Sequence, residues 1–433
     1  MGSSFIIFLS SCSVQKQIAK SANKDVLDAV PLQTAHVGIS IYEPSTDKYW
    51  YDYQGDKYFV PASNTKIPTC YAAMKYLGDS LVGLKYKMEK GEFVIQGTAD
   101  PTFLHKDFKD QPVFDFIKKI SAISLVGFSV SNWQEEHWGS GWSWNDYNES
   151  YMTERSPFPI YANLVAFSLK DNYIKATPSA FDTVSITYLP GTNPDSSEIT
   201  REISSNYFAV GKRDARFKAI EIPFTTKGYE VSTFLLNDTV KAQHPIYELP
   251  KYLDLPIQLK HIYSQPTDSV LKPMMHRSDN FFAEQLLLMV SNERLGIMND
   301  ERIIDTLLKT DFKDLPQKPG WVDGSGLSRY NLFTPKDFIF ILNKMKNEFG
   351  MERVKIIFPT GGEGTLADYY VTDSNYIYAK TGTLSGVIAI SGYLYTKKGK
   401  ELIFSVLVNN HKASGTEVRR AVEKFLHGIR NKY

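Results

Sequence analysis

The stretch PASNTKIP at positions 61–68 decides how the rest of the chain is interpreted. Ser63 and Lys66 lie three residues apart where a helix is expected to begin. A hydroxyl and an amine therefore share one face of that helix, one turn apart. An amine held there can take the hydroxyl proton and turn the serine into a nucleophile. The spacing alone is weak evidence, because the same pattern also begins at Ser13, Ser21 and Ser45.

The surroundings of the four serines separate them. Residues 13–30 are polar and are predicted to be a tether, which contains the first two serines. Residues 36–53 alternate apolar and polar side chains around a turn at Ser45, which predicts a β-hairpin. Only Ser63 directly precedes a helix with an apolar stripe, predicted over residues 61–77. The stripe consists of Ile67, Tyr71, Met74 and Leu77.

Length and composition give broad limits. The 433 residues favour two or three domains, and 42% hydrophobic with 22% charged residues is typical of a globular protein. A formal net charge of +1 gives no support for a nucleic-acid partner.

The N-terminus suggests a targeting signal. Residues 5–9 are apolar but far too few to span a bilayer, and residues 9–12 (LSSC) resemble the lipobox of a bacterial lipoprotein signal peptide. Residues 1–12 are therefore predicted to be a lipoprotein signal segment, with Cys12 lipidated after cleavage and the protein in the cell envelope, at the periplasm. The basic segment that usually precedes such a run is missing, and the alternative is an apolar tail with no targeting role.

Cysteine content limits the chemistry further. With Cys12 lipidated, Cys70 has no partner for a disulfide and is predicted to be a small buried core residue. Two cysteines cannot build a metal site, and no metal or other cofactor is expected.

The predicted organisation is a split domain with an insertion. Residues 31–81 and 263–433 carry the helical and long-strand signals, with strands over 376–409 and a closing helix over 415–430. Residues 82–262 read as an inserted β-rich region. This arrangement predicts an α+β or α/β fold, with a sheet flanked by helices.

Two clusters in the insertion have competing interpretations. The tryptophans could form a sugar-stacking platform, but a local hydrophobic core is favoured because aromatic side chains mostly bury area. The adjacent Glu135, Glu136 and His137 cannot all converge on a metal and are predicted to form a surface charge patch. The tryptophans are Trp133, Trp138, Trp142 and Trp144.

Two further motifs each occur once. Ser278-Asp279-Asn280 lies beside a helix, and Lys380-Thr381-Gly382 lies on a predicted strand. With Ser63-x-x-Lys66 they form the ordered signature S-x-x-K, S-D-N, K-T-G of penicillin-binding proteins and class A β-lactamases. One motif would be weak evidence, whereas three in order and in suitable contexts are strong.

Neighbouring segments sharpen the resemblance. HRSDNFFAEQL (276–286), DGSGLSRYN (323–331), PTGGEGTL (359–366) and AKTGTLSGVIAISGY (379–393) together resemble the class C low-molecular-mass penicillin-binding proteins, the D-alanyl-D-alanine carboxypeptidase/endopeptidases. The 215 positions between Ser63 and Ser278 fit this family, which carries its extra domains there. The resemblance implies a transpeptidase-like domain with an antiparallel sheet and a large, mostly β insertion.

The resemblance also implies roles for individual residues. Ser63 would be the nucleophile and Lys66 its base, with Lys380 as a second cation that favours a neutral Lys66. Ser278 would relay a proton to the leaving amine, and Asn280 would hydrogen-bond Lys66 and the substrate amide. Asp279 would hold its loop.

The K-T-G strand is expected to bind the substrate. Thr381 and Thr383 offer hydroxyls to a carboxylate, and Gly382 lets a substrate backbone lie against the strand. The resemblance places the oxyanion hole at the backbone N–H groups of Ser63 and Thr383. Asp323 and Arg329 would support a neighbouring loop. Ser325 in that loop has no base at suitable spacing.

The expected function is a serine DD-peptidase that cuts peptidoglycan stem peptides through an acyl-enzyme on Ser63 and is acylated by β-lactams. The protein would contact the membrane only through the lipid anchor. The alternatives are a β-lactamase or esterase on the same scaffold, or a penicillin-binding sensor with weak catalysis. A class A β-lactamase needs a deacylating glutamate between its second and third motifs, and Glu284, Glu293 and Glu301 lie there without a recognisable omega-loop pattern.

Overall fold

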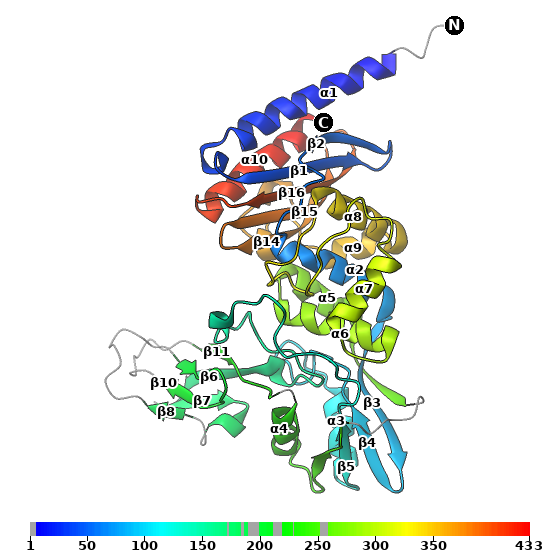
Figure 1. Cartoon of the computed structure of the whole chain (residues 1–433), viewed down its shortest axis with the longest axis vertical. Coiled ribbons are helices and arrows are strands. Elements are labelled where there is room, and N and C mark those ends of the chain that lie inside the picture. The colour runs from blue at the N-terminus through cyan, green and yellow to red at the C-terminus, as the bar shows by residue number, and fades with distance from the viewer. Residues whose placement is uncertain are drawn as a thin grey trace. The chain divides into compact units, whose positions relative to one another are not determined.

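The computed structural model describes residues 6–170, 173–182, 186–188, 199–210, 219–227, 229–251 and 259–433. It divides into two compact units, shown in Figure 1. Unit 1 comprises Met1–Met74, Leu271–Asp279 and Ile304–Tyr433, and unit 2 comprises Lys75–Val270 and Asn280–Ile303.

Unit 1 is built on a five-stranded antiparallel sheet in the order β14-β15-β16-β1-β2. Its middle strands are buried on both faces, so they appear in the sequence as continuous apolar runs. The predicted hairpin and C-terminal strands are confirmed. The strands are β1 (His36–Glu43), β2 (Lys48–Tyr53), β14 (Ile377–Leu384), β15 (Val387–Tyr395) and β16 (Glu401–Asn409).

Helices cover both faces of this sheet (Figure 1). On one face, α1 (Ile6–Ala22) and α10 (Gly415–Lys432) contribute to a core with alternate residues of the strands. On the other face lies α8 (Pro335–Phe349), where the Tyr393 hydroxyl donates to the Leu342 carbonyl at 2.8 Å. The sequence sets where two of these helices begin, because Thr334 with Asp337 and Ser414 with Glu417 form capping boxes.

The prediction of a tether over residues 13–30 is wrong. The helix α1 runs through its first part, a π-helical turn follows at Asn23–Leu27, and Ile18, Ala22 and Val26 are buried in the core. These three residues recur every four positions, a helical stripe that the polar composition of the segment masked. Residues 1–5 lie outside the described residues, and for residues 6–13 only the backbone is described, so lipidation of Cys12 stays a prediction.

The remaining helices of unit 1 surround the segment of the first motif. The helix predicted over 61–77 is present as a 3-10 turn, η3 (Ala62–Thr65), followed by α2 (Lys66–Tyr76). Cys70 on α2 is a fully buried core residue, as predicted. The other helices are α5 (Thr267–His276), α7 (Asp300–Lys309) and α9 (Met351–Ile357), of which α5 and α7 continue from unit 2.

Unit 2 is mostly β, in agreement with the predicted insertion, and includes α3 (Pro112–Ser121), α4 (Glu230–Val240) and α6 (Asn280–Leu295). One sheet has the order β12-β5-β4-β3-β13, and two smaller sheets have the orders β11-β6-β7 and β8-β10-β9. The strands are β3 (Ser80–Glu89), β4 (Glu92–Gln96), β5 (Val126–Ser129), β6 (Leu164–Lys170), β7 (Tyr173–Thr177), β8 (Ile186–Tyr188), β9 (Ile199–Arg201), β10 (Phe208–Val210), β11 (Ile220–Pro223), β12 (Ile246–Glu248) and β13 (Lys260–Pro266).

The predicted domain limits at 81/82 and 262/263 lie near the unit limits at 74/75 and 270/271. The grouping differs at α6, which belongs to unit 2 although its sequence continues the S-D-N motif. The domain limits therefore stay predictions.

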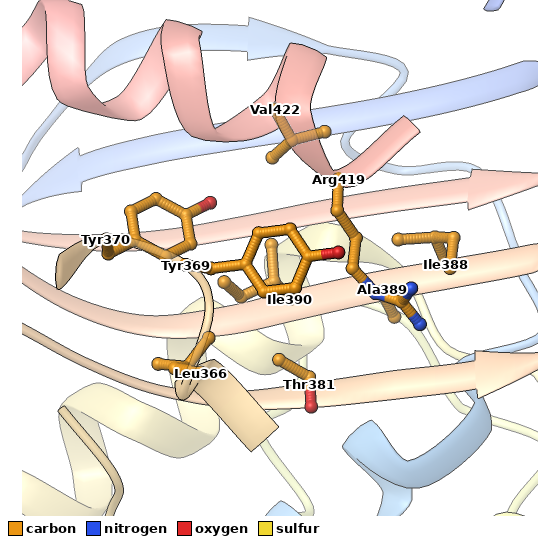
Figure 2. A pocket seen from close by; sticks show the side chains of 9 residues that line it. All are labelled: Leu366, Tyr369, Tyr370, Thr381, Ile388, Ala389, Ile390, Arg419 and Val422. Carbon is orange, nitrogen blue, oxygen red and sulfur yellow. The ribbon is translucent and has the colours of Figure 1, made fainter. Parts of the chain in front are cut away.

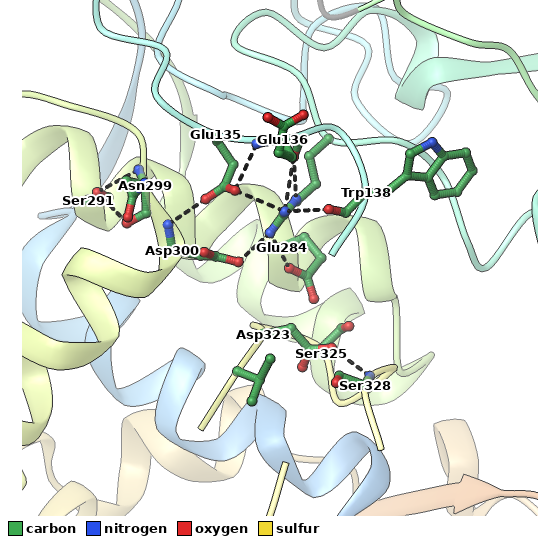
Figure 3. Close-up of polar contacts among 12 residues, drawn as sticks. Glu135, Glu136, Trp138, Glu284, Ser291, Asn299, Asp300, Asp323, Ser325 and Ser328 are labelled. Atoms are coloured by element: carbon green, nitrogen blue, oxygen red, sulfur yellow. Dashed lines mark hydrogen bonds and ion pairs between the residues drawn. The ribbon is translucent and has the colours of Figure 1, made fainter. Parts of the chain in front are cut away.

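The prediction of a surface charge patch at Glu135–His137 is wrong for Glu135, whose side chain is buried, whereas Glu136 is exposed. The guanidinium of Arg155 is buried and pairs with Glu135 (3.1 Å), Glu284 (3.6 Å) and Asp300 (2.5 Å), and Figure 3 shows the carboxylates converging. Because a distant arginine supplies the partner, the local sequence could not reveal the burial. The tryptophan cluster is a core only in part, since Trp133 is 3% exposed and Trp144 is 74% exposed.

Within the described residues, no helix has the length and apolar character needed to cross a membrane.

Candidate active site

Ser63 and Lys66 meet at the start of the α2 helix. Ser63 lies in the η3 turn and is partly exposed, while Lys66 is the first residue of α2 and is fully buried. The Lys66 Nζ atom donates to Ser63 Oγ at 3.0 Å and to the Ser325 carbonyl at 2.7 Å. The amine is therefore within direct proton-transfer reach of an accessible hydroxyl.

Ser278 is held in an unusual backbone conformation beside Lys380. Its φ of +62° lies in the left-handed region, which is uncommon for a residue other than glycine. The Lys380 Nζ atom donates to Ser278 Oγ at 2.9 Å and to the Thr381 carbonyl at 2.5 Å. Asp279 lies 3.6 Å from the Arg277 guanidinium, and its N–H donates to the Met274 carbonyl at 3.1 Å.

Two lysines share the site, and this affects their protonation. Lys380 is fully buried, and burial lowers the pKa of its ammonium well below the usual 10.5. The charge of the nearby Lys66 lowers the pKa of Lys380 further. Because the repulsion is mutual, the pair loses its first proton more readily than an isolated lysine would.

The K-T-G segment lies on β14, which is an edge strand of the sheet. The Ala379 N–H donates outward from the sheet to the Pro359 carbonyl at 3.1 Å. Because backbone direction alternates along a strand, the N–H groups of Thr381 and Thr383 face the same free edge. The edge can therefore accept a substrate backbone as an added strand.

Gly382 is required by a close approach. A Cβ atom at this position would lie 2.7 Å from the Pro61 carbonyl oxygen and 3.0 Å from the Ser63 nitrogen. The absence of a side chain thus lets the strand lie against the turn that carries Ser63, and it brings the Ser63 N–H close to the strand edge.

Asn64 is a site residue that sequence analysis missed. It is fully buried, and with its amide nitrogen toward the Lys380 carbonyl (3.0 Å) its oxygen accepts from Ser391 Oγ (2.7 Å). It therefore ties the nucleophile turn to β14 and β15. The only available signal was a polar residue between Ser63 and Lys66, inside a buried helix start.

Asp323 organises the loop from which Ser325 contacts Lys66. Its carboxylate is buried and accepts from the N–H groups of Gly326 (2.8 Å) and Ser328 (2.7 Å) and from the Asn331 amide (2.8 Å). Arg329 donates to the Ser385 carbonyl at 2.8 Å, so it contacts the β14–β15 turn rather than its own loop.

The two strand hydroxyls have different partners. Thr381 Oγ1 donates to Thr365 Oγ1 at 2.7 Å, whereas Thr383 Oγ1 accepts from the Arg419 guanidinium at 2.7 Å. Neither Thr365 nor Arg419 was identified from the sequence. Thr365 lies in the PTGGEGTL segment at 359–366, which the resemblance marked without giving this residue a role, whereas Arg419 lies in the C-terminal helix, outside every motif.

Unit 1 thus brings together Ser63, Lys66, Ser278 and Lys380 with the K-T-G-T strand. Asn280 belongs to unit 2, where its amide donates to the Tyr151 carbonyl at 2.9 Å. Across the described ranges, no group of three or more His, Cys, Asp or Glu side chains is arranged to hold a metal ion. The unit 1 residues provide a nucleophile, an adjacent amine and backbone N–H donors, which are the groups that acyl transfer requires.

Comparison with known proteins supports the same chemistry. A family described as the D-Ala-D-Ala carboxypeptidase 3 (S13) family matches residues 16–197 and 247–429. A D-alanyl-D-alanine carboxypeptidase of Actinomadura sp. (strain R39) is 25% identical over 89% of this chain and 80% of the relative. The D-alanyl-D-alanine carboxypeptidase DacB of Haemophilus influenzae is 24% identical over 97% of this chain and 95% of the relative.

The fold is similar to that of a solved structure. Penicillin binding protein 4 (dacB) from Haemophilus influenzae superposes with a TM-score of 0.73 at 20% identity, covering 95% of this chain and 98% of that one. The same protein has also been solved in complex with a β-lactam, and that structure superposes with a TM-score of 0.67 at 18% identity over the same shares of the two chains.

Proposed function

Because the chain belongs to the D-Ala-D-Ala carboxypeptidase 3 (S13) family, we propose that it is a serine DD-peptidase that forms its acyl-enzyme on Ser63. The substrate is a peptidoglycan stem peptide that ends in D-alanyl-D-alanine. The observation that carries the proposal is the 3.0 Å contact between Ser63 Oγ and the buried Nζ of Lys66.

Acylation follows from the geometry. The unprotonated Lys66 amine takes the Ser63 proton while Oγ attacks the carbonyl carbon of the penultimate D-alanine. The negative charge on the carbonyl oxygen is held by the N–H groups of Ser63 and Thr383. Loss of one such donor typically reduces the rate about 100- to 1,000-fold.

The second half of acylation concerns the leaving group. As the C–N bond breaks, the departing D-alanine amine takes a proton from Ser278 Oγ. Ser278 is resupplied with the proton that Lys66 took from Ser63, directly or by way of Lys380, so Lys66 is neutral again. Water then attacks the ester carbonyl with Lys66 as base, which releases the shortened peptide and restores Ser63. Asn280 is proposed to bind the substrate amide, and Asp279, Asp323 and Arg329 to support the surrounding loops.

The substrate carboxylate is proposed to lie beside the K-T-G-T strand. Lys380 supplies positive charge there, while Thr381, Gly382 and Thr383 supply the edge of β14 and its hydroxyl groups. A β-lactam carries a carboxylate and a strained acyl bond in a similar arrangement, so it would acylate Ser63 and act as a covalent inhibitor.

The test is labelling with a fluorescent penicillin, followed by peptide mass mapping. We expect one label per chain, on Ser63, and none in Ser63→Ala. Purified muropeptides should lose terminal D-alanine or be cut at D-alanyl cross-links. Label on another residue, or none at all, would contradict the proposal, and fast turnover of nitrocefin in place of stable labelling would favour a β-lactamase.

We also propose that the protein acts at the bacterial cell envelope, on the periplasmic side, anchored through a lipid on Cys12. The support is the LSSC sequence at 9–12. Metabolic labelling with a radioactive fatty acid should mark the full-length protein expressed in bacteria, and Cys12→Ala should abolish both the label and membrane fractionation. Label retained in Cys12→Ala would contradict the anchor.

A further inference from the structure

Arg419 on the C-terminal helix α10 contacts β14, the strand proposed to bind the substrate. Arg419 Nη2 donates to Thr383 Oγ1 at 2.7 Å, and Figure 2 shows its side chain extending from α10 toward the strands below. Thr383 is the last residue of the K-T-G-T segment and is exposed at the edge of the sheet. A permanent positive charge therefore stands beside the proposed carboxylate site.

The surroundings of Arg419 leave room for its guanidinium but do not neutralise it. Its guanidinium carbon lies 5.9 Å from the centre of the Tyr369 ring, and a Cβ atom at Gly415 would come within 3.1 Å of Nη1. Throughout the part of the chain that the structure describes, no Asp or Glu forms an ion pair with Arg419. The adjacent Arg420 differs, since it pairs with Glu423 at 2.6 Å.

The hydrogen bond from Arg419 leaves the Thr383 hydroxyl able to donate to a substrate. A guanidinium has only donors, so Thr383 Oγ1 must accept from Arg419, and its own hydrogen remains available. Thr381 differs, because its hydroxyl donates to Thr365. Thr383 is thus the strand hydroxyl that keeps a free donor, and its cationic neighbour strengthens that donor.

We propose that Arg419 is a specificity-determining residue. It orients the Thr383 hydroxyl to donate to the free C-terminal carboxylate of the substrate, and its charge favours that carboxylate over an uncharged amide or an internal peptide bond. The inference rests on the proposed function and adds to it the residue that distinguishes a terminal D-alanine from a continuing chain.

A small cavity beside Arg419 does not provide an alternative carboxylate site. It lies between α10 and the sheet and is lined by Tyr369, Thr381, Arg419 and apolar side chains (Figure 2). Its volume of about 20 Å³ holds roughly one water molecule, too little for a D-alanine residue. Recognition therefore takes place on the open strand edge.

The test compares two substrates in each variant. An acetylated tripeptide that ends in D-alanyl-D-alanine is assayed as the free acid and as its C-terminal amide. In Arg419→Ala we expect the acid-to-amide ratio of kcat/KM to fall about tenfold or more, mainly through KM for the acid. Arg419→Lys should recover part of the ratio, and Arg420→Ala is the matched control and should leave it unchanged.

A double-mutant cycle tests the route through Thr383. Thr383→Val removes the hydroxyl but keeps the backbone N–H of the oxyanion hole. If Arg419 acts through that hydroxyl, Arg419→Ala should lower the ratio much less in the Thr383→Val background than in the parent. An unchanged ratio in Arg419→Ala, or fully additive effects of the two substitutions, would overturn the inference.

Penicillin labelling at saturating concentration separates this result from a failure of the proposed function. Labelled, folded Arg419→Ala with an unchanged ratio contradicts only the role of Arg419. A parent protein without label on Ser63 contradicts the proposed function itself. Circular dichroism of each variant identifies any loss of folding.

Discussion

The Lys380 ammonium donates to the Ser278 hydroxyl at 2.9 Å, although the two residues lie 102 positions apart. This bond joins the S-D-N and K-T-G motifs directly, with Ser278 held at a φ of +62°. The same lysine is close enough to Lys66 for their charges to interact. The Ser63–Lys66 pair and the Ser278–Lys380 pair are thus coupled through the charges of the two lysines.

The shared charge of the two lysines predicts the pH dependence of acylation. Burial and the charge of Lys66 lower the pKa of Lys380, so the pair should lose its first proton well below pH 10.5. Acylation by a chromogenic β-lactam should therefore rise with pH, with a midpoint well below that value. In Lys380→Met the remaining lysine has no cationic neighbour, so the midpoint should move up and the rate should fall. An unmoved midpoint would show that the lysines are not coupled.

The lowered pKa of Lys380 also predicts a change in stability. Between its lowered pKa and 10.5 the unfolded chain binds more protons than the folded one, so the free energy of unfolding should rise with pH in that window. Urea unfolding at several pH values would measure the slope. Lys380→Met should flatten it and, by removing a buried charge, raise stability at pH 7 by about 1–3 kcal/mol. A slope that persists in the variant would assign the effect to other groups.

Lys66→Arg separates the role of an amine base from that of a positive charge. Arginine keeps the charge but cannot be deprotonated, so acylation of Ser63 should fall about 100- to 10,000-fold. Stopped-flow measurement with a β-lactam gives the rate. Lys66→Met, whose side chain is closer than arginine to lysine in volume, should show a similar loss of acylation while folding normally. Acylation that survives in Lys66→Arg would mean that another group takes the proton.

Gly382→Ala tests the close approach of β14 to the nucleophile turn. The new Cβ would meet the Pro61 oxygen at 2.7 Å and the Ser63 nitrogen at 3.0 Å, so one of the two segments must move. We expect a loss of acylation of at least about 100-fold, because the oxyanion donors are displaced. Gly428→Ala in α10 is the control. A Cβ there meets nothing closer than 4.0 Å, and the change should stabilise the helix by about 0.5–1 kcal/mol without affecting acylation.

The buried Arg155 cluster predicts a second pH dependence, in unit 2. Burial raises the pKa of Glu135 to about 7 against the opposing effect of Arg155, and the neighbouring Asp300 carboxylate raises it further. The folded chain therefore holds a proton that the unfolded chain has lost. Stability should be fully present below pH 4.5 and fall as pH rises through about 7.

Glu135→Gln should remove this dependence, which amounts to about 1–3 kcal/mol and is measurable by urea unfolding at pH 4.5, 6 and 7.5. Glu136→Gln is the matched control, since only the backbone carbonyl of this exposed residue contacts Arg155. An equal pH slope in both variants would contradict the assignment to Glu135.

Local sequence was sufficient to predict the three motifs, the hairpin over 36–53, the C-terminal strands and the family. These depend on local spacing and on the period of apolar residues, which any chain of this sequence carries before it folds. The spacing of Ser63 and Lys66 is of this kind, because one helical turn brings them together.

The contacts between distant segments became known from the folded structure alone. The helical stripe of Ile18, Ala22 and Val26 is buried because it packs against the sheet of unit 1. The Glu135 side chain is buried because it pairs with Arg155, which lies 20 positions away along the chain. Asn64 and Arg419 reach β14 for the same reason: burial and hydrogen-bond partners are set by long-range packing. The motifs in the sequence therefore predicted which chemistry to expect, while packing decided which additional side chains surround it.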